Sequence, residues 1–235
     1  MAFNRKIEAA PFEVALRPEH ISEFERRLYL QPRYDAKAID EYVVKFDSDD
    51  TTLITASGPK YDKKGVRDIR DASGLPLFEC EKIWAPAWRK RGPWIIRLPG
   101  SNSSSKAGDK ASEIAITQRT NAYWVNRFDM TFRNAAARDV KGEAEAMVTL
   151  HIRSSNALFC NWIVSLGDRI VVHIRESVDR NKRQDPTGRF LRSVPAQTEL
   201  YKRLTLDVIV AENFDLSLAA LIAVMVSDMT FSMQK

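Results

Sequence analysis

The pattern of apolar and polar positions is most distinctive near the end of the chain, where it predicts a buried helix. Residues 216–226 read LSLAALIAVMV, with no charge and a single serine. At helical spacing, the larger apolar side chains form one face and the alanines form a second face that is also apolar. Because a helix that is apolar on every side has no face suited to water, this segment predicts a helix in the interior of a fold.

The residues that bracket this segment argue against a membrane span. Asp215 precedes the run and Asp228 follows it, which leaves about 12 uncharged positions, whereas a membrane-spanning helix needs about 20. Asp215 is placed to cap the helix, since its carboxylate can accept the first free amide groups and meet the positive end of the helix dipole. An interfacial membrane helix would carry a basic face, which this segment lacks. The segment therefore predicts a core helix that begins after Asp215.

Short strands are predicted for most of the remaining chain, from alternating polarity or from runs of β-branched and aromatic residues. The predicted strands are residues 41–46, 51–56, 66–70, 75–84, 93–98, 112–118, 122–132, 145–153, 157–166, 168–176 and 202–210. Turn-forming residues separate many of them, as at 47–50, 71–74 and 166–168. This number of short strands is typical of a mainly β barrel or sandwich.

Three further segments interrupt the strand pattern. One early helix is predicted at 19–28, because Pro18 precedes it and apolar residues recur on one side. Residues 101–110, SNSSSKAGDK, predict a flexible loop, and residues 177–189 predict a basic loop between strands. No linker separates two cores, and 235 residues with 44% hydrophobic content can bury a single core. One domain is therefore predicted.

The net charge indicates which binding partners to expect, and the cysteine content indicates the cellular compartment. The 36 Lys and Arg residues against 31 Asp and Glu give a formal net charge of +5. An excess of this size favours acidic surfaces without requiring nucleic acid, which we do not expect as a partner. Cys80 and Cys160 each lie in an apolar predicted strand, which predicts free, buried thiols in a reducing compartment. Since the first residues lack the apolar core of a secretory signal, we expect a cytoplasmic protein.

Three features together resemble the tubby C-terminal-like superfamily. They are the many short strands, the hairpin sequence DASGLPLFE at 71–79 and the terminal sequence LTLDVIVAENFDLSLAALIAVMVSDM at 204–229. Within the superfamily, the LURP-one-related branch is the closer match. The resemblance implies a closed antiparallel β-barrel of about 12 strands around a buried hydrophobic C-terminal α-helix. The physical pattern agrees, because a closed barrel exposes no sheet edge and a helix along its axis meets apolar side chains on all sides.

The resemblance also implies a division of the chain and a role. Residues 1–39 lie outside it and are predicted to form an N-terminal arm with the short helix, while residues 40–235 form the barrel domain with its central helix at 215–228. Tubby proteins bind phosphoinositides through basic residues on barrel strands, and phospholipid scramblases share the fold. The resemblance therefore implies an association with lipid.

The histidines do not form a recognisable catalytic or metal site. His151 and His173 lie in the similar sequences VTLHIRSS and IVVHIRES, where alternation places them beside Arg153 and Arg175, opposite the aliphatic side chains. Such a ladder can hold an anion, but the outward face of two amphipathic strands is the interpretation we prefer. No metal-ligand spacing, serine-nucleophile motif or phosphate-binding glycine loop occurs, and neither cysteine has an activating histidine nearby in the sequence. We therefore expect no metal and no cofactor.

Basic clusters supply the candidate binding residues. Lys and Arg gather in GPKYDKKGVRDIR at 58–70 and in WRKRGPW at 88–94. Positive charge flanked by tryptophan suits a phospholipid headgroup layer, where indole rings lie at the interface and cations meet phosphate. The residues predicted to contact anionic lipid or a protein are Trp88, Arg89, Lys90, Arg91, Trp94, Lys63, Lys64 and Arg67.

Two functions remain open. The first is a non-enzymatic binding module, cytoplasmic and peripheral at membranes, that contacts anionic phospholipid headgroups or a protein partner through the basic surface. The second is a barrel that binds a small apolar molecule in a pocket at one end, such as a cofactor-free cyclase or isomerase. Its predicted lining is Tyr123, Trp124, Arg127, Phe128 and Asp129, with Asp129 and Arg127 as acid–base residues. A barrel interior occupied by its own helix would argue against the second function.

Overall fold

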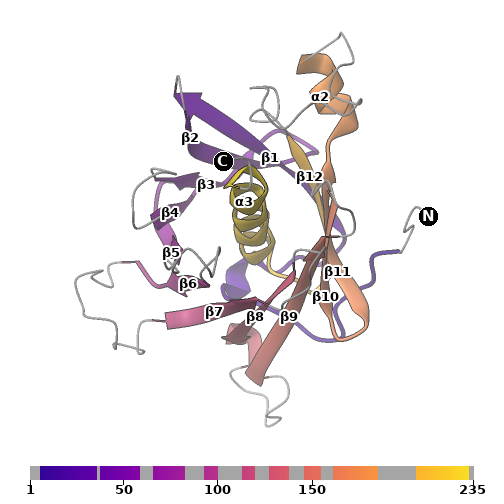
Figure 1. Cartoon of the computed structure of the whole chain (residues 1–235). Coiled ribbons are helices and arrows are strands. Elements are labelled where there is room, and N and C mark those ends of the chain that lie inside the picture. Colours follow the sequence, from indigo (N-terminus) through magenta and orange to yellow (C-terminus); the bar gives the residue numbers. More distant parts are fainter. Residues whose placement is uncertain are drawn as a thin grey trace.

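The computed structural model describes residues 6–35, 38–58, 66–82, 93–99, 113–119, 127–137, 146–154, 161–184 and 205–232. Within these ranges, antiparallel strands close into a twelve-stranded barrel, and the last helix lies along its axis (Figure 1). Consecutive strands are neighbours around the barrel, and β1 pairs with β12 to close it. The mainly β fold with a central C-terminal helix, predicted from the sequence, is confirmed.

The strands follow the predicted segments closely, and the first strand is the one that the pattern missed. The strands are β1 (Arg26–Asp35), β2 (Ala38–Phe46), β3 (Thr52–Ser57), β4 (Val66–Asp71), β5 (Pro76–Lys82), β6 (Trp94–Arg97), β7 (Glu113–Arg119), β8 (Arg127–Arg133), β9 (Met147–Ser154), β10 (Asn161–Leu166), β11 (Arg169–Glu176) and β12 (Leu206–Val210). The helices are η1 (Pro18–His20), η3 (Ala135–Ala137), α2 (Val178–Gln184) and α3 (Leu216–Ser232). Helix α2 lies within the segment predicted to be a basic loop.

Side chains alternate between the barrel interior and its outer wall. In β9, Val148, Leu150 and Ile152 are buried, whereas Thr149 and His151 are partly exposed. The inward side chains of the strands and those of α3 form one continuous hydrophobic core. The outer wall is therefore the surface on which the polar strand residues lie.

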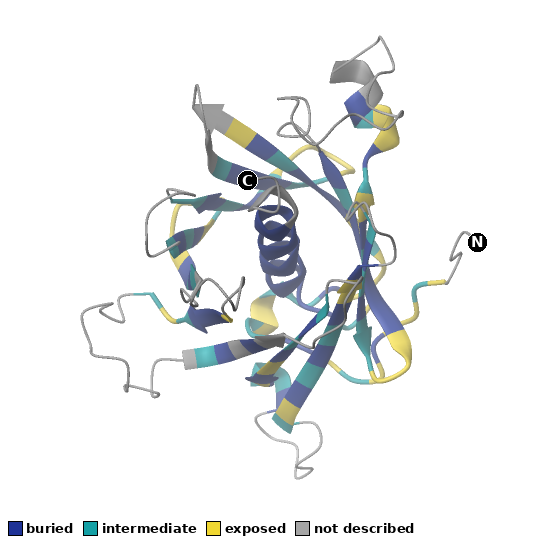
Figure 2. Cartoon of the chain, viewed as in Figure 1, coloured by how far each residue is buried: buried dark blue, intermediate teal, exposed yellow. Residues whose placement is uncertain are grey.

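Helix α3 occupies the axis of the barrel. All residues from 216 to 229 are buried, and the coil of α3 inside the barrel is drawn in the buried colour (Figure 2). Within the described residues, no helix is both long enough and apolar enough to cross a membrane. The apolar character of α3 on every side is explained by the strands that surround it.

Asp215 caps α3 and also binds the N-terminal arm, residues 6–25. Its Oδ1 accepts hydrogen bonds from the amides of Ser217 (2.7 Å) and Leu218 (3.2 Å), as the sequence predicted. Its Oδ2 accepts hydrogen bonds from the amides of Leu16 (3.0 Å) and Arg17 (2.8 Å). The carboxylate is fully buried, and burial raises its pKa. One side chain therefore joins the start of the central helix to the arm.

The arm covers the end of the barrel at which α3 begins. Ala10, Val14 and Ala15 are buried, and Val14 forms a parallel bridge with Phe214. The amide of Ala15 donates a hydrogen bond to Asn134 Oδ1 at 2.9 Å. We call this end of the barrel the arm end.

The helix predicted at 19–28 is wrong. The structure has a short 3-10 turn, η1, and strand β1 already begins at Arg26. Leu28 and Leu30 belong to the hydrophobic core, whereas Tyr29 between them is covered by Arg180 instead, and Phe24 is 50% exposed. This is the two-residue period of a strand, which the apolar spacing of a helix had concealed. The barrel consequently begins at Arg26, before the boundary at residue 40 that the sequence suggested.

The opposite end of the barrel, which we call the loop end, is where α3 ends. Because consecutive strands are antiparallel, the connections β1–β2, β3–β4, β5–β6, β7–β8, β9–β10 and β11–β12 all leave the barrel at this end. The contact of Asp228, near the end of α3, with Arg67, near the start of β4, places the end of the helix there as well. The loop end and the outer wall are therefore the surfaces that the arm does not cover.

Candidate functional site at the loop end and outer wall

Two residues predicted to contact lipid lie in the interior instead. Arg67 is 2% exposed and Trp94 is 5% exposed. Trp94 begins β6, and its amide donates a hydrogen bond to Thr117 Oγ1 at 2.7 Å. The assignment of Arg67 and Trp94 to a surface cluster is therefore wrong. The other predicted contact residues, Lys63, Lys64, Trp88, Arg89, Lys90 and Arg91, lie outside the described residues.

Arg67 is bound to the central helix by a buried ion pair. Its Nε donates to Asp228 Oδ2 and its Nη2 donates to Asp228 Oδ1, both at 3.0 Å. Its Nη1 donates to the carbonyl oxygen of Gly58 at 2.6 Å. Tyr42 donates its hydroxyl hydrogen bond to Asp228 Oδ1 at 2.7 Å. A charge on an otherwise apolar helix is thus satisfied by two strands of the barrel.

Burial controls the protonation of the groups around this ion pair. Burial, reinforced by the neighbouring Asp228 carboxylate, raises the pKa of the Tyr42 hydroxyl well above its usual range. Burial also raises the pKa of the Cys80 thiol far above its usual range. Cys80 is free and buried, as predicted, and its thiol is a poor nucleophile because it stays protonated. Cys160 lies outside the described residues.

The residues predicted to line a small-molecule pocket do not face one space. Phe128 points into the core and packs against Trp162, with ring centroids 6.3 Å apart. Arg127 and Asp129, its neighbours on β8, lie on the outer wall. Tyr123 and Trp124 lie outside the described residues. Strand alternation therefore separates the predicted acid–base residues from the aromatic ring between them.

Asp129 instead binds a histidine on the neighbouring strand. Asp129 and His151 are cross-strand partners, and Asp129 Oδ1 lies 2.7 Å from His151 Nδ1. The next outward pair toward the loop end is Arg127 opposite Arg153. The next outward pair toward the arm end is Thr131 opposite Thr149. The sequence placed His151 and Arg153 on one face, but the register that brings Arg127 and Asp129 beside them was not predicted.

The second predicted histidine also lies on the outer wall. His173 Nε2 lies 2.6 Å from Asn161 Oδ1 on β10. Burial lowers the pKa of His173, and the positive charge of Arg175 lowers it further. The outward position predicted for His151 and His173 is thus correct, and each ring is held by a polar residue of an adjacent strand.

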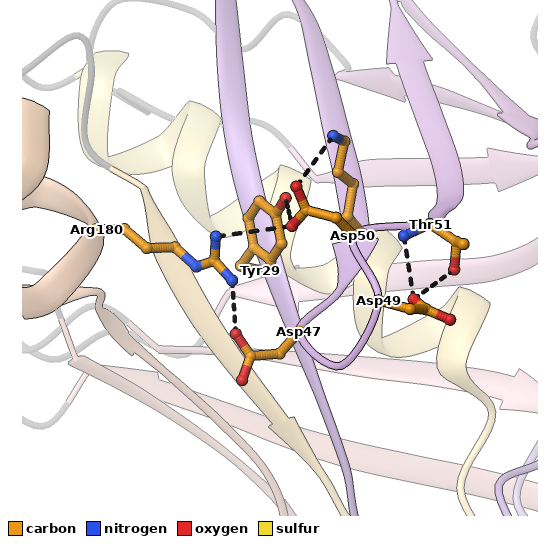
Figure 3. A network of polar contacts seen from close by, with 7 residues as sticks. Tyr29, Asp47, Asp49, Asp50, Thr51 and Arg180 are labelled. Carbon is orange, nitrogen blue, oxygen red and sulfur yellow. Dashed lines mark hydrogen bonds and ion pairs between the residues drawn. The ribbon is translucent and has the colours of Figure 1, made fainter.

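Helix α2 is attached to the barrel through Arg180, a cation of the predicted basic loop. Its Nη2 donates to Asp47 Oδ1 at 2.6 Å, and its guanidinium carbon lies 3.6 Å from the ring centroid of Tyr29 (Figure 3). Asp50 accepts the hydroxyl hydrogen bond of Tyr29 and lies 3.8 Å from Arg180 Nη1. Arg180 is therefore neutralised by the β2–β3 turn rather than available as a free surface cation.

No group of three or more metal-ligating His, Cys, Asp or Glu side chains occurs in the part of the chain that the structure describes. The outer wall near the loop end carries basic side chains. Outward arginines from β8, β9 and β11 lie near the loop end: Arg127, Arg153 and Arg175.

A closed twelve-stranded antiparallel barrel around a hydrophobic C-terminal helix defines the class of tubby-like barrel proteins. A family model described as LURP-one-related matches residues 26–227, and the chain belongs to the LURP-one-related family. The match begins at the first residue of β1 and ends within α3, so it spans the barrel and most of its central helix.

Among solved structures, the chain is similar to the X-ray structure of a protein from Arabidopsis thaliana. The TM-score is 0.54 at 14% sequence identity, and the match covers 92% of this chain and 98% of that one. At this identity the likeness concerns the fold. No curated protein sequence matches the chain significantly.

Proposed function

We propose that this protein is a non-enzymatic binding module that contacts anionic phospholipid surfaces with the loop end of its barrel. The observation that carries the proposal is topological. The segments that hold Lys63, Lys64 and Trp88 to Arg91 connect β3 to β4 and β5 to β6, and both connections leave the barrel at the loop end. Because the described strand ends that flank both basic segments lie at the loop end, a contact surface shared by the two clusters is favoured there.

The occupied interior supports a function on the outside. Helix α3 fills the barrel axis and is bound by Arg67 and Tyr42, so side chains of the protein itself occupy the space where a barrel enzyme would bind its substrate. The predicted acid–base pair, Arg127 and Asp129, faces outward. Both observations favour a binding module over a cyclase or isomerase.

The chemistry of the clusters favours a phospholipid headgroup layer. Several cations within a short segment gain favourable interaction with an anionic membrane, at about 1 kcal/mol for each Lys or Arg near the surface. The net charge of +5 acts in the same direction. A cytoplasmic location, peripheral at membranes, fits this role and the free Cys80 thiol.

Sedimentation with vesicles tests the proposal. We expect the protein to sediment with vesicles that contain phosphatidylserine or a phosphoinositide but not with neutral phosphatidylcholine vesicles. The variant R89E/K90E/R91E should lose this sedimentation. The matched control K6E/R27E/R133E makes the same change in net charge at exposed positions nearer the arm end and should retain it.

Three results would reject the proposal. They are equal recovery with neutral and anionic vesicles, equal loss in both triple variants, and no loss in R89E/K90E/R91E. In any of these cases the basic segments would have to be assigned to a protein partner or to a solvated surface.

A further inference from the structure

The outer wall carries a cross-strand pair of like charges that folding alone does not require. Arg127 and Arg153 are direct cross-strand partners on β8 and β9, and both alternate outward from buried neighbours. The Cβ atoms of such partners lie about 5 Å apart, and like charges in this arrangement destabilise a sheet. A neutral residue at either position would relieve the repulsion without disturbing the core. The pair therefore indicates a role in binding an anion.

Neither guanidinium is neutralised by the residues that the structure describes. No ion pair joins Arg127 or Arg153 to a carboxylate in these ranges, and the buried Nε of Arg127 has no hydrogen-bond partner there. Asp129, the next outward residue on β8, is already bound to His151 at 2.7 Å. By contrast, Arg175 on the same wall lies 4.0 Å from the carboxylate of Asp207. The two facing arginines thus differ from a neighbouring arginine of the same surface.

His151 adds a third group on the same face. It lies two residues before Arg153 on β9, and its Nδ1 is held by Asp129. Because a carboxylate only accepts, Nδ1 is the donor in this pair, and the Nε2 atom on the other side of the ring can donate to an anion when the ring is doubly protonated. Ser165, opposite His151 on β10, donates its hydroxyl hydrogen bond to the His151 carbonyl oxygen at 3.4 Å rather than to the ring.

We propose that Arg127, Arg153 and His151 form a phosphate-binding site on the outer wall. The planar guanidinium groups provide paired N–H donors that match two oxygens of one phosphate, and a phosphate dianion would neutralise both charges at once. A free Asp129 carboxylate would repel the phosphate, but this carboxylate is directed to the His151 ring by their hydrogen bond. The phosphate group belongs either to a soluble molecule or to a lipid headgroup. The site consists of strand residues and does not depend on the proposed contact through residues 88–91.

Isothermal titration calorimetry at constant ionic strength tests the site. The soluble probes are inorganic phosphate and inositol 1,4,5-trisphosphate, and the third probe is a vesicle that contains phosphatidylinositol 4,5-bisphosphate. We expect R127Q or R153Q to weaken binding about tenfold, because each removes charge-assisted hydrogen bonds. The matched control is R133Q, since Arg133 is an exposed arginine of the same strand whose partner is the neutral Met147. This variant should bind like the wild type.

The outcomes separate this site from the proposed lipid contact. If the wild type and R89E/K90E/R91E bind a soluble probe and R127Q/R153Q does not, the result supports a phosphate site for soluble ligands. The same pattern with the vesicle alone supports the site with a lipid headgroup as the source. Absence of binding to all three probes, or equal affinity of the wild type and R127Q/R153Q, overturns it. R127Q/R153Q should melt at or above the temperature of the wild type in the absence of phosphate, which verifies that a loss of binding is not a loss of folding.

Discussion

The carboxylate of Asp228 on α3 and the guanidinium of Arg67 on β4 form two hydrogen bonds of 3.0 Å inside the barrel. These residues lie 161 positions apart in the sequence, and both are almost fully buried. The pair joins the end of the central helix to the wall at the loop end. It also fixes which residues of α3 face β4, because an apolar helix alone has no strong preference for one rotation about its axis.

Removing either charge of this pair should destabilise the protein strongly. We expect D228N or R67M to lower the free energy of unfolding by about 3–5 kcal/mol, because each leaves the other group buried without its partner. The double variant R67M/D228L should be less destabilised than the sum of its single variants. Urea unfolding monitored by tryptophan fluorescence measures all three.

The control for this prediction is the partly exposed pair of Arg175 and Asp207, in which Arg175 Nε lies 4.0 Å from Asp207 Oδ2. D207N should cost no more than about 1 kcal/mol, since surface ion pairs contribute little. Similar losses for D207N and D228N would show that the burial of the Arg67 pair has no special energetic role.

A charge in the middle of α3 should prevent folding rather than alter a membrane contact. Ala220 and Ala223 are completely buried against the barrel. We expect A220D and A223D each to cost at least about 4–5 kcal/mol, which is comparable to the whole stability of many domains. The measurements are soluble yield and circular dichroism, with T131D on the exposed face of β8 as the control. A soluble A220D variant with a cooperative unfolding transition would contradict the buried position of this helix.

Asp215 should control the attachment of the N-terminal arm as well as the stability of α3. D215A removes the helix cap and the acceptor of the Leu16 and Arg17 amides, so we expect a loss of about 2–3 kcal/mol. Hydrogen exchange at Leu16 and Arg17 should become faster. S217A is the matched control, because it removes one hydroxyl donor to Asp215 and leaves the arm contacts intact. Unchanged exchange at both arm amides in D215A would show that other contacts hold the arm.

The local pattern predicted the parts of the fold that depend on neighbouring residues. Alternation revealed β2 to β12, and the run of apolar residues after Asp215 revealed α3. Strand β1 was not predicted because Phe24 and Leu28 match a helical period. In the structure, the side chains that point into the barrel are those of Leu28 and Leu30, which match the period of a strand. Pairing with β12 makes this segment a strand, and that pairing is a long-range contact.

The candidate sites depended even more on long-range register. The sequence indicated a basic cluster around Arg67, but it did not indicate that Arg67 pairs with Asp228 inside the barrel. A signal was present, because a carboxylate at the end of an apolar core helix needs a buried partner. The cross-strand pairing of Arg127 with Arg153 depends on the alignment of β8 with β9, which no local pattern contains. The sequence thus predicted which residue types the candidate sites contain. Which residues pair with one another depends on the strand register of the closed barrel.

The network at Tyr29 makes the protein sensitive to alkaline pH. Burial and the hydrogen bond to Asp50 raise the pKa of Tyr29 from 10.0 to about 12. Between these values the unfolded chain loses the tyrosine proton before the folded chain does. The contribution of Tyr29 to stability is therefore present below pH 10 and decreases as the pH rises toward 12.

Substitutions of its partners should move this titration in opposite directions. D50N should lower the pKa of Tyr29, because the negative charge that opposes ionisation is removed, and R180M should raise it, because the nearby positive charge is lost. The measurement is the ultraviolet absorbance of tyrosinate against pH, with Y29F subtracted to isolate the signal of Tyr29. E23Q, at an exposed position of the arm, should leave the titration unchanged. If D50N and R180M shift the pKa in the same direction, the change reports loosening of α2 from the barrel instead of the charges in this network.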